Sequence, residues 1–139
     1  MIPKELDNLS EEESKKLLST LEYIHSKVSD RFVYKADSLV WNKREHWENY
    51  EQIPDEGKIY GDCDCFAMAC RKELRKLDLP SRLIFCLVST TGHLVLECNG
   101  WILDNINSYV RANTSLAYTW VSMSGYERGD PWYIINPLP

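Results

Sequence analysis

An Asn-Gly pair at positions 99 and 100 constrains the fold of this chain more than any other feature of its sequence. It separates two short apolar segments, residues 92–98 and 101–107. Asn-Gly between two such segments is the strongest local signal of a β-hairpin with a two-residue type I′ turn, because both residues tolerate positive φ. The sequence therefore predicts two antiparallel strands that are joined directly at this turn.

The two-residue turn also determines which residues face one another. Cys98 is expected to pair with Trp101, which places Val95 opposite Asp104. Side chains alternate between the two faces of a strand, so His93 and Asp104 are predicted to share a face. Diagonal neighbours of this kind lie about 7–8 Å apart, within reach of a hydrogen bond between imidazole and carboxylate. A shift of one residue in register would place them on opposite faces.

A cysteine begins the clearest helix in the second half of the chain. Residues 63–77 carry an apolar stripe, with cationic residues toward the C-terminal end, and Gly61-Asp62 precedes them. Unpaired backbone N–H groups and the positive end of the helix dipole would surround the Cys63 thiol. This environment favours the thiolate and predicts a lowered thiol pKa. The same N–H groups can stabilise an oxyanion.

The remaining pattern predicts one further long helix and several strands. Ser10 and Glu13 form a capping-box pattern ahead of apolar residues at helical spacing, which predicts a helix over residues 11–29. Strands are predicted at residues 82–89, 119–123 and 132–135, with a loop at 51–58 and short helical turns at 43–50. Together with the hairpin, this pattern indicates an α+β fold.

Length and composition exclude several classes of protein. The chain has 139 residues and a formal net charge of −5, which fits a single domain over residues 1–139 and argues against a nucleic-acid binder. The longest apolar run covers residues 83–88, whereas a membrane span needs about 20 residues, so no span is predicted. The first residues lack the basic and apolar regions of a signal peptide, and a cytoplasmic location is expected.

Five cysteines in a chain with that expected location do not predict a disulfide framework. A zinc site is a weaker alternative, because the spacing of the candidate ligands does not match that of structural zinc sites. Those ligands would be Cys63, Cys65 and Cys70, with His93 or Cys98. Cys70 and Cys86 lie in apolar segments and are expected in the core. His25 and His46 have no evident partner.

Cys63, His93 and Asp104 together have the composition of a nucleophilic triad. In that chemistry the thiol attacks an acyl carbon, the imidazole takes the thiol proton and later protonates the leaving group, and the carboxylate orients the imidazole. Each residue also has a structural interpretation: an inert cysteine at a helix start, a hydrogen-bonded histidine within a strand, and an aspartate that ends a strand. The predicted hairpin register favours the catalytic hypothesis, because it places the imidazole beside the carboxylate.

Three short motifs extend this pattern to a known family. They are Gly-Asp-Cys-Asp-Cys-Phe-Ala at residues 61–67, Gly-His-Leu-Val-Leu at 92–96 and Trp-Ile-Leu-Asp-Asn at 101–105. In this order and spacing they resemble the bacterial transglutaminase-like cysteine proteinases, over roughly residues 20–110. The resemblance implies a papain-like, transglutaminase-like α+β core, in which the helix bearing the nucleophile packs on an antiparallel β-sheet. It also implies Cys63 as nucleophile, His93 as base and Asp104 as orienting carboxylate.

The motif around Cys63 differs from that of the family at both positions that directly follow the cysteine. The family has Gly-Asp-Cys-Glu-Asp-Tyr-Ala, so Asp64 replaces a glutamate and Cys65 replaces an aspartate. Some family members require calcium near this loop, but Asp62 and Asp64 are a thin set for an ion that takes 6–8 oxygens. We therefore expect no metal and no other cofactor. Candidates to support the site or its oxyanion are Asn42, Gln52 and Asp62.

The residues and the resemblance together predict a thiol hydrolase that cleaves an amide bond in a peptide or protein through an acyl-enzyme. An amide is favoured because a protonated imidazole suits an amine leaving group. The alternatives are a cell-wall peptide or amide hydrolase with the same triad, acyl transfer to an amine, and a non-catalytic binding or inhibitor module on a papain-like scaffold. A bacterial or phage source is expected, and no oligomeric state is indicated.

Overall fold

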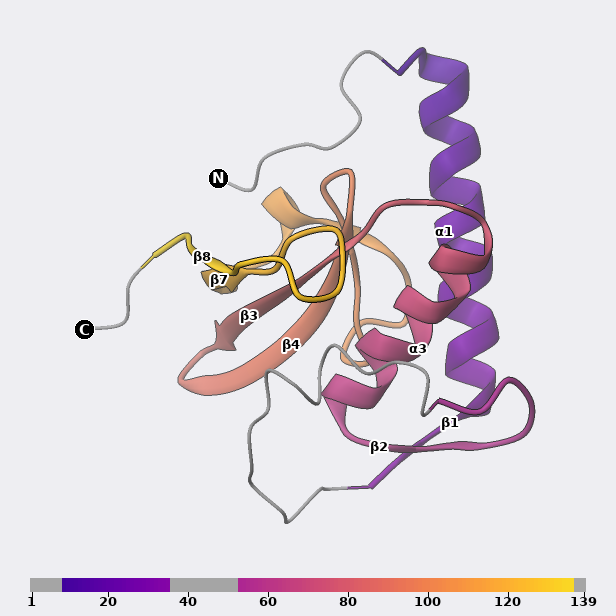
Figure 1. The fold of residues 1–139 in the computed structure, drawn as a ribbon, viewed down its shortest axis with the longest axis horizontal. Coiled ribbons are helices and arrows are strands. Elements are labelled where there is room, and N and C mark those ends of the chain that lie inside the picture. Colours follow the sequence, from indigo (N-terminus) through magenta and orange to yellow (C-terminus); the bar gives the residue numbers. More distant parts are fainter. Residues whose placement is uncertain (1–8, 36–52, 137–139) are drawn as a thin grey trace.

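The computed structural model describes residues 9–35 and 53–136 of the chain. Within these ranges, two α-helices lie beside a twisted sheet (Figure 1). The elements in chain order are α1 (Glu11–Arg31), β1 (Phe32–Tyr34), β2 (Ile59–Gly61), α3 (Cys63–Lys76), β3 (Arg82–Val88), β4 (Thr91–Cys98), β5 (Trp101–Leu103), β6 (Arg111–Ala112), a 3-10 turn (Asn113–Ser115), β7 (Thr119–Met123) and β8 (Tyr133–Ile134).

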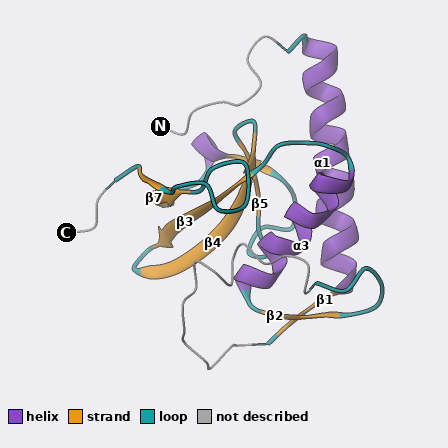
Figure 2. Cartoon of the chain, viewed as in Figure 1, coloured by secondary structure: helices purple, strands orange, loops and turns teal. Residues whose placement is uncertain are grey.

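The main sheet is antiparallel throughout and has the strand order β6-β5-β4-β3-β7-β8. Helix α3 packs against β4, and α1 packs on α3 and reaches β5 (Figure 2). Apolar side chains from both helices and from β3, β4 and β5 form one shared core between these layers. The predicted α+β class, with the cysteine-bearing helix packed on an antiparallel sheet, is confirmed.

Helix α1 begins where its capping box predicted. The Ser10 hydroxyl accepts a hydrogen bond from the Glu13 backbone N–H at 3.1 Å, and the Glu13 carboxylate accepts one from the Ser10 backbone N–H at 3.2 Å. Two of the N–H groups that lack partners at a helix start are thereby satisfied. The helix continues to Arg31 rather than ending at residue 29, and the chain passes directly into β1. Its buried face consists of Leu17, Leu21, Ile24, His25 and Val28.

Two short strands that the sequence did not predict connect α1 to α3. Strand β1 pairs in parallel with β2, with Phe32 opposite Ile59. Strand β2 then leads into α3 through Gly61, where a Cβ atom would lie 2.3 Å from the Cys65 Sγ atom. Only glycine fits at this close approach, so the entry into α3 depends on it. The helical turns predicted at residues 43–50 lie outside the described residues, whereas residues 53–58 form the predicted loop.

The hairpin adopts the predicted turn and register. Asn99 and Gly100 both have positive φ, at 51° and 88°, as a type I′ turn requires. Cys98 pairs with Trp101 across the strands. Strand β5 ends at Leu103, earlier than predicted, because the next residue bends the chain.

The bend that ends β5 is made by the side chain of Asp104. Its Oδ1 atom accepts hydrogen bonds from the Asn107 backbone N–H at 3.0 Å and from the Asn107 side-chain amide at 2.9 Å. An aspartate that binds the backbone ahead of it in this way replaces the strand pairing with a turn. The side chain that ends the strand is therefore held in one orientation.

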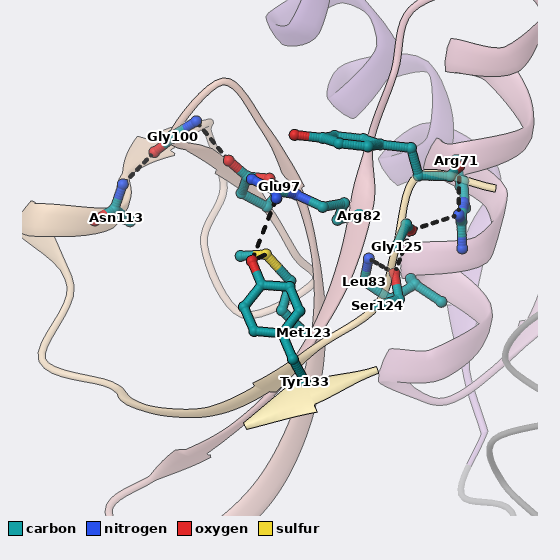
Figure 3. Close-up of polar contacts among 11 residues, drawn as sticks. Arg71, Arg82, Leu83, Glu97, Gly100, Asn113, Met123, Ser124, Gly125 and Tyr133 are labelled. Carbon is teal, nitrogen blue, oxygen red and sulfur yellow. Dashed lines mark hydrogen bonds and ion pairs between the residues drawn. The ribbon is translucent and has the colours of Figure 1, made fainter. Parts of the chain in front are cut away.

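A buried ion pair stabilises the other end of the hairpin (Figure 3). The Arg82 Nε atom lies 3.3 Å from the Glu97 Oε1 atom, and the second oxygen of Glu97 accepts the Gly100 backbone N–H at 2.7 Å. The Arg82 guanidinium also donates to the Tyr133 hydroxyl at 3.3 Å and lies 4.5 Å from the centre of the Tyr126 ring. These contacts join β3, β4, the hairpin turn and β8.

Neither helix in the described part of the chain is long and apolar enough to cross a bilayer.

The capping box predicts a measurable contribution to stability. Replacing Ser10 with alanine should lower the free energy of unfolding by about 1 kcal/mol, because the Glu13 N–H loses its acceptor. Urea denaturation measures the change. The control is Ser19→Ala, an exposed position in the middle of α1, which should change stability by less than about 0.5 kcal/mol. Equal effects of the two substitutions would contradict the prediction.

Breaking the buried ion pair should cost much more stability than breaking an exposed one. Glu97→Ala should lower the free energy of unfolding by about 3–5 kcal/mol, because the Arg82 guanidinium stays buried without its carboxylate. Glu127→Ala is the matched control: Glu127 pairs with Arg75 at 3.1 Å but is 71% exposed. Its loss should cost less than about 1 kcal/mol. A similar cost for both variants in denaturation experiments would be the contrary result.

Candidate active site

Cys63 is the first residue of α3 and opens onto a pocket of about 470 Å³. The pocket lies where the start of α3 meets β1, β3 and β4. It is lined by Tyr34, Asp62, Cys63, Asp64, Phe85, Gly92, His93 and Leu94. The structure therefore brings the predicted nucleophile and the predicted base to the same pocket, although they are separated in the sequence by a helix and a strand.

His93 forms the contact that the hairpin register predicted. Its Nε2 atom lies 3.0 Å from the Asp104 Oδ2 atom, and both side chains are buried. An ionised carboxylate oxygen can only accept, so Nε2 carries a proton, and in the neutral imidazole Nδ1 then presents a lone pair. The pair thus fixes the tautomer as well as the orientation of the imidazole.

Asp104 is surrounded by hydrogen-bond donors. Besides His93 and Asn107, the Tyr118 hydroxyl donates to its Oδ2 atom at 2.8 Å. Burial by itself would raise the pKa of the Asp104 carboxyl, but the hydrogen bonds from His93, Asn107 and Tyr118 lower that pKa below its ordinary value. The carboxylate is therefore ionised at neutral pH, although it is almost fully buried.

His25, for which the sequence indicated no partner, is hydrogen-bonded to the main chain of Asp104. Its Nε2 atom donates to the Asp104 carbonyl oxygen at 2.8 Å, and its ring contacts Phe66 edge-on at 5.3 Å between centroids. A signal for its burial was present, because His25 follows Leu21 by one helical turn and so shares the apolar face of α1. No sequence signal pointed to Tyr118, which approaches Asp104 from the segment before β7.

The Cys63 thiol is protonated in this arrangement. It donates to the Asp64 Oδ1 atom at 3.3 Å, and within the described residues it makes no hydrogen bond to His93. Burial and the negative charge of Asp64 raise the pKa of the thiol to about 12, against the smaller opposing effect of the Leu94 backbone N–H. The lowered pKa that the helix start predicted is therefore not found. Desolvation and a neighbouring carboxylate outweigh the helix dipole at this position.

The other predicted supporting residues divide into two groups. Asp62 is the N-cap of α3, and its Oδ1 atom accepts the Asp64 backbone N–H at 3.1 Å. Its observed role is to begin the helix that carries Cys63. Asn42 and Gln52 lie outside the described residues, so their support of an oxyanion stays a prediction.

The residues around Cys63 do not fit a calcium ion. Ligand atoms of Asp62, Cys63 and Asp64 lie within 4.8 Å of one another, but the two carboxylates already accept hydrogen bonds from Asp64 N–H and from the Cys63 thiol. Two carboxylates and a thiol among the described residues are also a poor donor set for an ion that takes six to eight oxygens.

The zinc alternative finds no support in the described part of the chain either. No group of potential ligands there includes Cys65 or Cys70. Cys70, Cys86 and Cys98 are buried in apolar clusters, as expected for Cys70 and Cys86. The thiols other than Cys63 and Cys65 therefore contribute to packing.

Comparison with known protein families gives one result that agrees with the fold and the motifs. Residues 3–138 match the family described as bacterial transglutaminase-like cysteine proteinases. No curated protein and no solved structure matches the chain. The family match covers almost the whole chain and includes the cysteine, histidine and aspartate that the pocket and the hairpin bring together. The chain therefore belongs to the bacterial transglutaminase-like cysteine proteinase family.

Proposed function

We propose that residues 1–139 form one domain that hydrolyses an amide bond of a peptide or protein through an acyl-enzyme on Cys63. His93 is the general base and acid, and Asp104 orients it. One observation carries the proposal: Cys63 and His93 line the same pocket, and the His93 imidazole is bonded to the buried Asp104 carboxylate at 3.0 Å. Membership of a cysteine proteinase family supports the same reaction class.

The tautomer of His93 supports a definite sequence of proton transfers. Nδ1 takes the Cys63 proton as the sulfur forms a bond to the substrate carbonyl carbon. The imidazolium then gives that proton to the amine as the carbon–nitrogen bond breaks, which leaves a thioester. A water molecule attacks the thioester while His93 accepts its proton, and the carbon–sulfur bond breaks to release the acid and restore the thiol.

The raised pKa of Cys63 defines the starting point of this reaction. The enzyme begins with a neutral thiol bonded to Asp64 rather than with a preformed thiolate–imidazolium pair. The thiol must leave Asp64 before it can donate to His93. Proton transfer therefore accompanies the arrival of substrate instead of preceding it.

The start of α3 provides a group for the oxyanion. The backbone N–H of Cys63 lies at the N-terminal end of the helix, where such groups lack intrahelical acceptors. An oxyanion that forms beside the sulfur would be placed next to this N–H and the positive end of the helix dipole. This is the described group best placed for the role.

A non-catalytic binding module is the second candidate. The observation that favours it is the hydrogen bond from the Cys63 thiol to Asp64, which keeps the sulfur protonated. In that case the pocket would recognise a partner without chemistry. The two candidates differ in whether Cys63 becomes acylated, which can be measured directly.

The effect of Asp64 on the thiol gives the first prediction. Asp64→Asn removes a negative charge 3.3 Å from the sulfur, so the thiol pKa should fall. A fall of one pH unit gives about tenfold more thiolate at any pH below the pKa, and iodoacetamide should alkylate Cys63 faster by about that factor. Peptide mass spectrometry locates the adduct.

The control is Asp55→Asn, the same substitution at an exposed residue that pairs with Lys72 and Lys76. It should leave the rate at Cys63 unchanged. An unchanged rate in Asp64→Asn across pH 7–10 would show that Asp64 does not hold the thiol proton.

Acylation by a small activated ester tests the proposed function without knowledge of the substrate. p-Nitrophenyl acetate should acetylate Cys63, detected by mass spectrometry together with release of nitrophenolate. His93→Ala should slow the reaction by about 100-fold or more, because a general base contributes about 10²–10⁴-fold. Asp104→Asn should also slow it, since the imidazole loses its orienting carboxylate.

Cys65→Ser is the matched control, because Cys65 lies in the same turn of α3 but does not line the pocket. It should acetylate at Cys63 at the wild-type rate. Absence of both acetyl-Cys63 and nitrophenolate release, or equal rates in wild type and His93→Ala, would refute the hydrolase and leave the binding module.

A further inference from the structure

Two donors share one oxygen of Asp104. The His93 Nε2 atom lies 3.0 Å from Oδ2, and the Tyr118 hydroxyl donates to the same atom at 2.8 Å. Tyr118 directly precedes β7, whereas His93 lies on β4. The carboxylate is thus contacted at a single atom from β4 and from the segment before β7.

Tyr118 is held in place by three further contacts. Its hydroxyl oxygen accepts a hydrogen bond from the Asn107 side-chain amide at 3.0 Å. Its ring meets the His93 ring edge-on, with centroids 5.9 Å apart and planes at 89°. The ring also contacts the Trp120 ring, with centroids 5.5 Å apart. The hydroxyl and the ring are therefore both constrained, and the ring limits the rotation of the imidazole.

The hydroxyl of Tyr118 stays a donor over a wide pH range. Burial and the hydrogen bond to Asp104 raise its pKa above the ordinary value. A protonated hydroxyl withdraws charge from the carboxylate oxygen that it binds. Because His93 binds the same oxygen, the attraction between Asp104 and an imidazolium is weaker when the hydroxyl is present.

We propose that Tyr118 is a positioning residue for His93: its ring and hydroxyl hold the imidazole and the Asp104 carboxylate together, and its hydroxyl limits how strongly Asp104 attracts the protonated imidazole. The catalytic consequence rests on the proposed function of Cys63 and His93. A base that is bound too strongly to its carboxylate partner would remain protonated at neutral pH and could not accept the thiol proton. Tyr118 therefore keeps the base available.

Other titratable groups face His93 and must be considered. The Cys63 thiol and its two flanking aspartates line the pocket at the start of α3 and at its N-cap, and the Cys86 thiol on β3 donates to the His93 carbonyl oxygen at 3.4 Å. All of them remain in a variant that lacks only the Tyr118 hydroxyl. A change in the titration of His93 in that variant is therefore attributable to the hydroxyl.

Tyr118→Phe removes the hydroxyl and keeps the ring. The His93 imidazole should then titrate at a higher pH, by about 0.5 or more, as measured by NMR of the histidine ring protons with His93→Ala to assign the signal. The acid limb of the pH profile for acetylation of Cys63 should move to higher pH by the same amount. Tyr23→Phe, the same substitution at an exposed residue of α1, should change neither measurement.

A merely structural role for Tyr118 would have a different result. Tyr118→Phe would then lower the thermal unfolding midpoint while the His93 titration and the pH profile stayed as in wild type, and that outcome overturns the proposal. Asn107→Ala removes the amide that donates both to the Tyr118 hydroxyl and to the Asp104 Oδ1 atom, and it is a second variant expected to shift the titration in the same direction. An unshifted titration in both folded variants also overturns it.

The two proposals fail in different experiments. If His93→Ala acetylates at the wild-type rate, the hydrolase is refuted, but the NMR titration of His93 in Tyr118→Phe still tests the effect of the hydroxyl. If His93→Ala is slow and Tyr118→Phe is identical to wild type at every pH, the hydrolase stands and the role of Tyr118 is refuted.

Discussion

The buried carboxylate of Asp104 connects parts of the structure that lie far apart in the sequence. Its two oxygens accept hydrogen bonds from His93 on β4, from Asn107 in the following turn and from Tyr118 before β7. Its main-chain carbonyl accepts one from His25 on α1. A buried charge is costly unless it is paired and hydrogen-bonded, so the hairpin, the turn, β7 and α1 must all be in place together. The orientation of His93 in the pocket depends on this one residue.

The parts of the fold and site that could be predicted are governed by local rules. The Asn-Gly turn determines the hairpin register, and the register alone places His93 beside Asp104. The capping residues of α1 likewise lie within a few residues of the N–H groups that they satisfy. Short-range patterns of this kind can be read from one sequence, because the interacting groups are covalently close.

The parts that were not predicted depend on contacts between distant segments. The parallel pairing of β1 with β2 joins segments on either side of residues 36–52, and Tyr118 reaches Asp104 from the segment before β7. The pKa of Cys63 was predicted in the wrong direction, because the helix start was considered without the desolvation of the thiol or the charge of Asp64. Burial is a property of the folded chain, so its effect on a titrating group follows only from the three-dimensional structure.

The hydrogen bond from Cys63 to Asp64 also bears on the chemical durability of the protein. Peroxide oxidises thiolates far faster than neutral thiols, and the sulfinic and sulfonic products are not restored by ordinary thiols. A sulfur that stays protonated at rest is thus a poor target for oxidants. The hydrogen bond to Asp64 should therefore slow the oxidation of the Cys63 sulfur by peroxide.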